Sequence, residues 1–259
     1  MSIVAKDGPA AGHSGGDLVL RSAQHRPHVV PRISNVALKV VMAVTGAIFV
    51  AFVLVHMIGN LKVFFGPEDY NAYAAFLRNL LYPLLPHGGA LFIFRIVLGS
   101  ALILHVSAGL TIWIRGRRAR GSFRRTGLRR LTFGARTMII SGLIMLTFVV
   151  VHLLDLTIGA VVASDEFRHP MHTEGELSVH AYENLVASLS RPWMAIFYTL
   201  VMVVVSLHIA QGCWNVVNDL GITGLRLRKI LLLLGLVVAL AIVVCNGALP
   251  MLVLMGVIA

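Results

Sequence analysis

The sequence predicts an all-α integral membrane protein with five transmembrane helices, in which helices I–IV form a duplicated four-helix bundle. Of the 259 residues, 58% are hydrophobic and 13% are charged, and the mean hydropathy is +0.85. This composition is typical of membrane proteins. Five apolar runs are long enough to cross about 30 Å of hydrocarbon at a rise of about 1.5 Å per residue. The first four runs also carry the same residues in the same order, twice.

Two parts are expected, a cytoplasmic tail over 1–35 and a transmembrane domain over 36–258. The tail is polar and lacks the hydrophobic stretch of a signal peptide, so no cleaved leader is expected. The helices are expected near 36–60, 91–114, 136–160, 194–217 and 229–258.

Local signals refine these helices. Ser34 or Asn35 is expected to cap the first helix. The amphipathic stretch 66–83 predicts a short interfacial helix. Pro250 lies inside the last apolar run and predicts a kink there. The fifth run has no counterpart in the repeat and holds no histidine.

The distribution of charge predicts the orientation. Sixteen of the 22 basic residues lie before the first helix, between the second and third, and between the fourth and fifth. The opposite loops hold eight acids against four bases. The positive-inside rule then places the N-terminus in the cytoplasm and the C-terminus outside. Because the positive charge follows the membrane topology, nucleic acid is not an expected partner. The arginines between 115 and 136 suit anionic lipid headgroups or a soluble partner protein.

The repeat centres on four histidines. Ten residues separate Gly46 from His56, and ten separate Gly142 from His152. In the even helices, His105 precedes a glycine by four residues, and His208 does the same. A recurrence of this kind indicates a tandem duplication of a two-helix unit.

Each of these histidines is a functional candidate, because an ionisable side chain inside a membrane is costly. A single one is explained equally well by a hydrogen bond between helices. Four at duplicated positions favour two stacked sites, His56 with His152 in the outer half and His105 with His208 in the inner half. Paired imidazoles across a helical bundle suit the axial ligation of haem iron.

Several segments carry a family resemblance. VLVHMIGN, LILHVSAGLTIW, VVVHLLDL and VSLHIAQGCWNVVNDLGI resemble the histidine helices of the single-chain, five-helix cytochrome b membrane anchor of succinate dehydrogenases and fumarate reductases. AYENLVASLSRP resembles the segment before the fourth helix of that family. The resemblance spans about 36–225, in helix count, order and topology.

The resemblance implies a function in the respiratory chain and the tricarboxylic acid cycle. It implies two b-type haems, the outer one on His56 and His152 and the inner one on His105 and His208. It implies a flavoprotein that oxidises succinate and an iron–sulfur subunit on the cytoplasmic face of a bacterial membrane. The chain would then pass electrons to a quinone, often menaquinone, and perform no chemistry on succinate itself.

Two cysteines keep an alternative open. Cys213 and Cys245, together with His105 and His208, form the ligand set of a Rieske-type [2Fe–2S] centre. The simpler interpretation of a membrane cysteine is a small apolar side chain that fills space. The two cysteines meet only if the last helix protrudes below the membrane, so that Cys245 drops toward the level of Cys213.

Other functions also stay open. Intramembrane histidines with Asp155 suit a proton channel or a secondary transporter. A purely structural anchor needs no ligand at all. His169, His172 and His180 lie in one acidic loop, where a metal site is a further hypothesis. Candidate quinone contacts are the polar residues near helix ends: Arg32, Ser34, Asn35, Lys39, Arg95 and Asp155. Each of these also suits snorkelling, capping or ion pairing.

Overall fold

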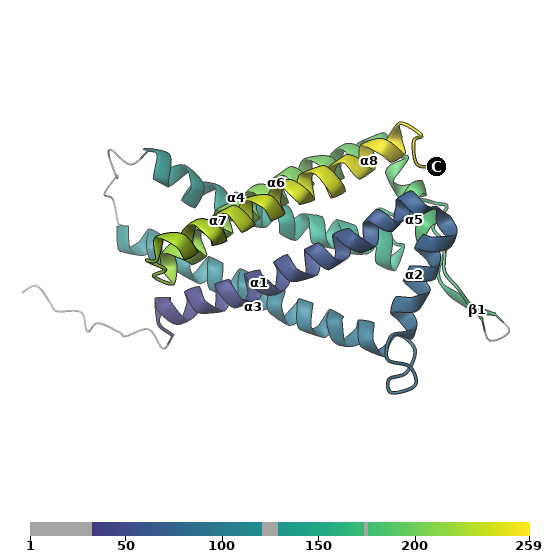
Figure 1. Cartoon of the computed structure of the whole chain (residues 1–259), viewed down its shortest axis with the longest axis horizontal. Helices are drawn as coiled ribbons and strands as arrows, with labels where there is room; N and C mark the ends of the chain where they lie inside the picture. The colour runs from purple at the N-terminus through teal and green to yellow at the C-terminus, as the bar shows by residue number, and fades with distance from the viewer. Residues whose placement is uncertain (1–32, 121–128, 174–175) are drawn as a thin grey trace, which may run out of the picture. The chain divides into compact units, whose positions relative to one another are not determined.

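Five long helices run back and forth between two ends of the molecule in the computed structural model (Figure 1). The structure describes residues 33–120, 129–173 and 176–259, which belong to one unit, Ile33–Ala259. The long elements are α1 (Asn35–Asn60), α3 (Gly89–Arg120), α4 (Arg129–His152), α6 (Pro192–Asp219) and α7 (Leu225–Ala241). Shorter elements extend or join them: η1 (Leu61–Phe65), α2 (Pro67–Asn79), η2 (Leu153–Ile158), β1 (Met171–Thr173), β2 (Glu176–Ser178), α5 (Ala181–Leu189), η3 (Ile242–Asn246) and α8 (Gly247–Leu254).

All five helices are long and apolar enough to cross a membrane, which confirms a multi-pass all-α protein. The second helix is longer than expected, beginning at Gly89 and continuing to Arg120. The first begins after Ser34, whose side chain accepts a hydrogen bond from Ala37 N at 3.1 Å, so the predicted N-cap is confirmed. Residues 1–32, which include most of the predicted tail and Arg32, lie outside the described residues.

The last span is interrupted just before its proline. α7 ends at Ala241, η3 is a π-helical segment over Ile242–Asn246, and α8 then contains Pro250. A proline has no N–H and crowds the carbonyl four residues earlier, here that of Asn246. The wider π turn ends at that residue, where the regular hydrogen-bond ladder is broken.

α6 is the central helix, packed against α1, α4, α5, α7 and α8. In the most apolar 18-residue stretch of α6, 44% of the residues are buried, whereas none are buried in the corresponding stretch of the span that contains α4. α1 packs mainly along α3, and α4 mainly along α6. The outward faces are strongly apolar, with Leu104 53% and Leu240 62% exposed. Such surfaces suit lipid as the solvent.

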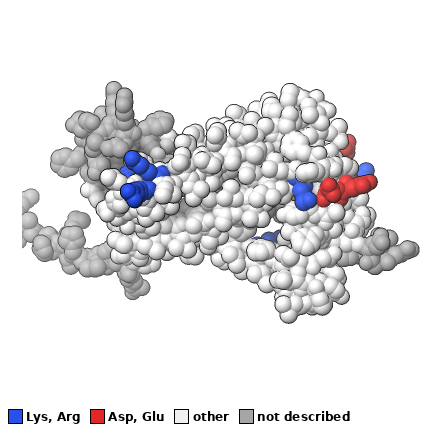
Figure 2. Space-filling model, in the orientation of Figure 1, with Lys and Arg blue, Asp and Glu red and all other residues white. Residues whose placement is uncertain are grey.

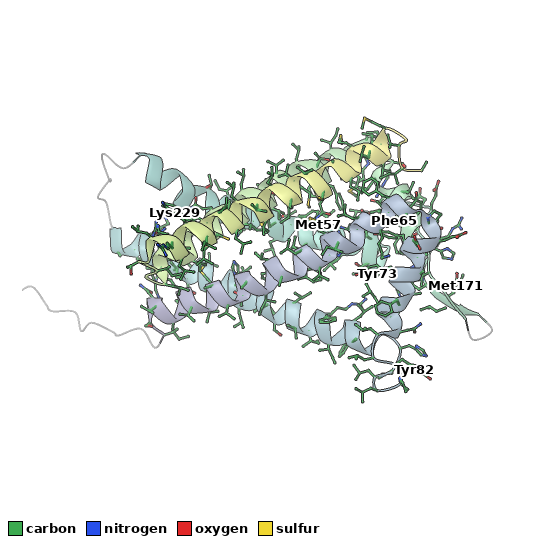
Figure 3. All side chains as sticks on the ribbon, viewed as in Figure 1. Met57, Phe65, Tyr73, Tyr82, Met171 and Lys229 are labelled. Atoms are coloured by element: carbon green, nitrogen blue, oxygen red, sulfur yellow. The ribbon has the colours of Figure 1, made fainter. Side chains whose placement is uncertain are left out.

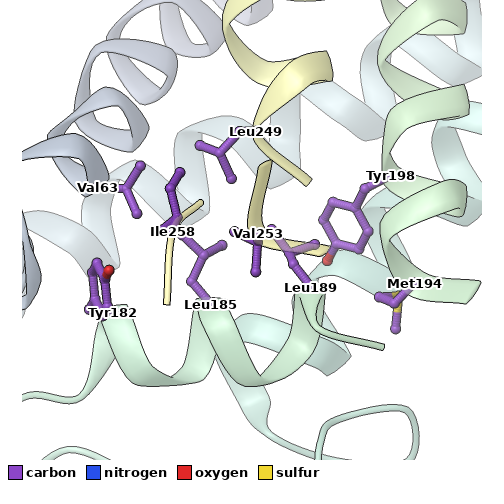
Figure 4. Packing of buried hydrophobic residues seen from close by; sticks show 9 residues of the cluster. All are labelled: Val63, Tyr182, Leu185, Leu189, Met194, Tyr198, Leu249, Val253 and Ile258. Carbon is purple, nitrogen blue, oxygen red and sulfur yellow. The ribbon is translucent and has the colours of Figure 1, made fainter. Parts of the chain in front are cut away.

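The two ends differ in charge and in packing. The basic end holds the start of α1, the end of α3 and the turn from α6 to α7, and Lys229 marks it in Figure 3. The hairpin end holds α2, α5, the C-terminus and the antiparallel hairpin of β1 and β2. Figure 2 shows Lys and Arg side chains at the basic end, while the visible acids lie at the hairpin end. Figure 4 shows apolar side chains from η1, α5, α6, α8 and the C-terminus converging at the hairpin end.

Candidate functional site

The four predicted histidines come from four different long helices and lie at two levels. His56 on α1 and His152 on α4 are in edge-to-face ring contact, with centroids 5.9 Å apart and ring planes at 83°. His105 on α3 and His208 on α6 are near enough to interact electrostatically. Within the described residues, these two rings make no ring contact with each other. We call the first two the hairpin-end pair and the second two the basic-end pair.

Each member of the basic-end pair contacts a hydroxyl group of a neighbouring helix, which is α1 for His105 and α4 for His208. Thr45 Oγ1 lies 2.8 Å from His105 Nδ1, and Ser141 Oγ lies 2.8 Å from His208 Nδ1. Thr45 and Ser141 immediately precede the repeated glycines, Gly46 and Gly142. The same contact therefore occurs between α1 and α3 and between α4 and α6. The duplication itself stays an interpretation of these paired residues.

The hydroxyl protons indicate the tautomer of both rings. Thr45 Oγ1 donates to Val41 O at 2.7 Å, and Ser141 Oγ donates to Met138 O at 3.1 Å. A hydroxyl has a single proton, so each oxygen is then left to accept from the histidine Nδ1–H. With the hydroxyl protons assigned to these carbonyls, the lone pair of each imidazole is assigned to Nε2. Fixing Nδ1–H in this way is the usual second-shell arrangement of a metal-binding histidine.

The repeated glycines lie beside these rings. A Cβ added at Gly46 would lie 3.6 Å from His105 Cε1, and one at Gly142 would lie 3.8 Å from His208 Cε1. These are ordinary van der Waals distances, so the histidines alone do not require glycine. At these distances an imidazole lies directly against the backbone of α1 at Gly46 and of α4 at Gly142.

The hairpin-end pair is surrounded by aromatic rings. Phe52 stacks on His56 with centroids 5.5 Å apart, and Phe148 stacks on His152 at 5.5 Å. Both phenylalanines precede their histidine by four residues, one helical turn. The two half-repeats therefore give the same local packing here as well.

Of the two histidines in the hairpin-end pair, only His152 contacts a polar network in the described part of the chain. Its Nδ1 lies 3.3 Å from the hydroxyl of Tyr198, which donates to Asp155 Oδ2 at 3.0 Å. Ser188 donates to the same carboxylate oxygen, and Arg191 Nη2 donates to Oδ1 at 2.7 Å. Asp155 is 1% exposed and has partners at both oxygens. The Tyr198 hydroxyl donates its proton to Asp155, so the tyrosine oxygen accepts from His152 Nδ1–H. The lone pair of the His152 ring is then assigned to Nε2.

The backbone explains how Asp155 reaches this position. Immediately after His152, the chain changes from α-helix to the π-helical segment η2, which ends at Gly159 in the left-handed region with φ of 70°. Wider turns of this kind redirect side chains and recur at functional sites. Asp155 therefore points toward α5 and α6 and away from lipid.

This donor set fits haem at both levels. Three of the four histidines, His105, His152 and His208, have Nδ1 engaged and Nε2 left as a neutral nitrogen donor. Each level has one imidazole from each half of the chain, and these imidazoles would be the residues that hold a haem iron there. His56 completes the set through its contact with His152.

The two cysteines are not brought together. Cys213 packs against α7 at Gly235, where an added Cβ would lie 2.8 Å from the cysteine Sγ. Cys245 is ten residues further along the same span, or about 15 Å at a helical rise of about 1.5 Å per residue. Both are free thiols. The alignment of Cys213 with Cys245 that a shared cluster needs is not observed in the described part of the chain.

Most of the predicted quinone contacts have structural partners. Ser34 caps α1, and Asn35 Oδ1 accepts from Arg115 Nη1 at 2.8 Å. Lys39 pairs with Asp219 at 2.7 Å, which joins the start of α1 to the end of α6. Asp155 pairs with Arg191. Arg95 is different, because it lines a small pocket at the hairpin end.

The loop histidines are spread among separate contacts. His169 lies edge-to-face with Phe167 at 5.1 Å, and His180 Nε2 lies 3.1 Å from Ser178 Oγ. The side chain of His172 lies outside the described part of the chain. Among the side chains that the structure describes, no group of three or more His, Cys, Asp and Glu is arranged to hold a metal ion.

Sequence reasoning missed the partners of the histidines, which are Thr45, Ser141 and Tyr198, and the partners of Asp155, which include Ser188 and Arg191. A signal was available for the first two, because a hydroxyl residue precedes both repeated glycines. Phe52 and Phe148 were detectable in the same way. Nothing in the sequence pairs Tyr198 with Asp155, which are 43 residues apart.

Comparison with known proteins gave no match with a family model, a curated protein or a solved structure. The resemblance to cytochrome b membrane anchors thus stays a prediction from the quoted segments.

Proposed function

We propose that this chain is the membrane-anchor and electron-transfer subunit of a succinate:quinone oxidoreductase, with two b-type haems between its helices. The observation that carries the proposal is the matched Nδ1 contact of His105 and His208, which leaves one Nε2 donor on each half of the chain. His56 and His152 would hold the second haem. When bound, the haems supply one-electron transfer across the bilayer.

The protein contributes position and protection from water. The hydroxyls of Thr45, Ser141 and Tyr198 hold three imidazoles in one tautomer and one orientation. The apolar outer faces keep both levels inside hydrocarbon. The basic end, with its many arginines, would face the cytoplasm and receive the iron–sulfur and flavoprotein subunits.

The haem proposal is favoured over an iron–sulfur centre because Cys213 on α6 lies against Gly235, whereas Cys245 lies ten residues beyond that glycine on the last span. It is favoured over a structural anchor because the hydroxyl contacts of His105 and His208 match in the two halves. The channel or transporter hypothesis has less support, since Asp155 is closed off by Ser188, Arg191 and Tyr198.

The test is a dithionite-reduced minus oxidised visible spectrum of the protein purified with its partners, with iron and acid-labile sulfide assays on the same sample. We expect b-type bands at two haems per chain. Absence of haem bands, with iron and sulfide beyond the content of the soluble subunits, would replace haem with a cluster. Absence of both signals would leave a structural anchor or a transporter, which proton flux in liposomes separates.

A further inference from the structure

A small pocket at the hairpin end combines two arginines and His87 with apolar residues, and none of the four histidines of the two pairs lines it. Its volume is about 220 Å³, and its lining includes Arg78 from α2, Arg95 from α3 and Leu177 from β2. Gly88, which also lines the pocket, has a φ of 75° at the turn into α3 and donates from its N–H to Arg78 O at 2.6 Å. That bond holds the end of α2 against the start of α3.

The pocket gathers positive charge. Burial, and then the like charge of Arg95, lower the pKa of Arg78. Within the described ranges neither arginine forms an ion pair with a carboxylate. The guanidinium of Arg78 donates to Ala74 O, at 3.4 Å. Two cations that line one pocket are destabilising without a counter-charge, and an anion bound there would reduce that repulsion.

The start of α3 adds to the same potential. The helix begins at Gly89, and its first-turn N–H groups direct a partial positive charge toward its N-terminal end. Arg95 lies six residues further on, or about 9 Å into the apolar span. An arginine at that depth extends toward the level of the lipid phosphates.

Exposed apolar side chains lie close in sequence to the residues that line the pocket. Phe92 and Ile96 flank Arg95 on α3 and are 61% and 56% exposed. Leu84, in the turn between α2 and α3, is 82% exposed. A small inorganic anion has no use for such a surface, whereas acyl chains do. Aromatic side chains at an interface are also typical of contact with lipid headgroups and upper acyl chains.

We propose that this pocket binds an anionic phospholipid, with the phosphodiester between Arg78 and Arg95 and the acyl chains along the exposed face of α3. The net charge of the site selects anionic over zwitterionic headgroups. The site does not depend on haem, so this inference stands apart from the proposed electron transfer.

Lipid retention by the full-length protein in neutral detergent tests the proposal, read by native mass spectrometry with phosphatidylglycerol and phosphatidylcholine as probes. We expect at least about fivefold tighter binding of phosphatidylglycerol, and a loss of about fivefold in Arg95→Gln, from the contribution of one basic residue near a bilayer. Arg78→Gln should give a similar loss. Arg168→Gln is the matched control, since it removes an exposed arginine at the same end but outside the pocket.

Three results would overturn the proposal. One is equal retention of the two lipids by the unmodified chain, a measurement that needs no variant to fold. Another is displacement of phosphatidylglycerol by inorganic phosphate at equal concentration, which would make the site one for free anions. The third is displacement by menaquinone with no headgroup preference, which would assign the pocket to quinone.

Discussion

In the predicted duplication, the two members of each histidine pair occupy equivalent places, yet the surroundings of the hairpin-end pair differ from those of the basic-end pair. At the basic end both rings are held alike, by Thr45 and by Ser141, each at 2.8 Å. At the hairpin end only His152 has a polar partner among the described residues, the hydroxyl of Tyr198. His56 has ring contacts with Phe52 and His152 instead.

The difference follows from what surrounds each pair. The hydroxyl residues beside the basic-end pair each directly precede a glycine of the predicted repeat, so both halves of the chain have one. The network behind His152 involves α5 and the loop before it, through Ser188, Arg191 and the backbone of Val162. A repeated sequence can therefore give a symmetric pair where the contacts lie within the repeat. It gives an asymmetric pair where the connecting segments take part.

Replacement of one histidine from each pair has the largest expected effect. His208→Ala should abolish the haem of the basic-end pair and leave the other, and His152→Ala should do the reverse. The reason is that an iron without its second imidazole loses the bis-histidine state. Reduced-minus-oxidised spectra and haem content per chain measure it. Replacement of His180, a loop histidine outside both pairs, is the control. Loss of both haems in both variants would show that the two sites are not independent.

Disruption of the buried ion pair should come next. Asp155→Ala leaves the Arg191 guanidinium uncompensated, with its partner site fully buried, and should lower the free energy of unfolding by about 3–5 kcal/mol. Asp155→Asn keeps an oxygen for Ser188 and should cost less. Thermal unfolding of the purified chain in detergent reports both. An Asp155→Ala variant as stable as the unmodified chain would contradict the network.

Loss of single hydroxyls sharpens the comparison further. Thr45→Val and Ser141→Ala should each weaken haem retention at the basic-end pair by about 10–100-fold, because each removes the hydrogen bond that orients a ligand histidine. Tyr198→Phe should do so only at the hairpin end. Thr147→Val is the matched control, because Thr147 Oγ1 donates to the carbonyl of Leu143, at 3.1 Å, on its own helix. Equal effects of Thr45→Val and Thr147→Val would remove the special role of Thr45.

The exposed ion pair at the basic end should matter least. Lys39 and Asp219 have side chains 36% and 38% exposed, against 23% for Arg191 and 0% for Asp155. Lys39→Met should therefore lower the free energy of unfolding by less than about 1 kcal/mol. The effect of the substitution should become smaller still in high salt, which screens the exposed pair. Chemical or thermal unfolding at two salt concentrations checks this. A loss as large as that of Asp155→Ala would mean that the pair is effectively buried.

The sequence alone determined the features that depend on local chemistry. Apolar length predicted five spans, Ser34 was a recognisable cap, and Pro250 marked the region where the last span is interrupted. The spacing of the histidines indicated which helices carry them. These features follow from one stretch of chain, where hydropathy, capping and the missing proline N–H act directly.

Only the tertiary structure decided which side chains meet. Helices that are apolar on nearly every side carry little information about their rotation or their register against one another. The contacts of Thr45, Ser141 and Tyr198 with histidines, and the distance between Cys213 and Cys245, depend on both. The position of Asp155 also depends on packing. A π turn sets the direction of its side chain, and its partners lie on α5, on α6 and at Arg191 between these two helices. Those relations arise from packing between segments distant in sequence.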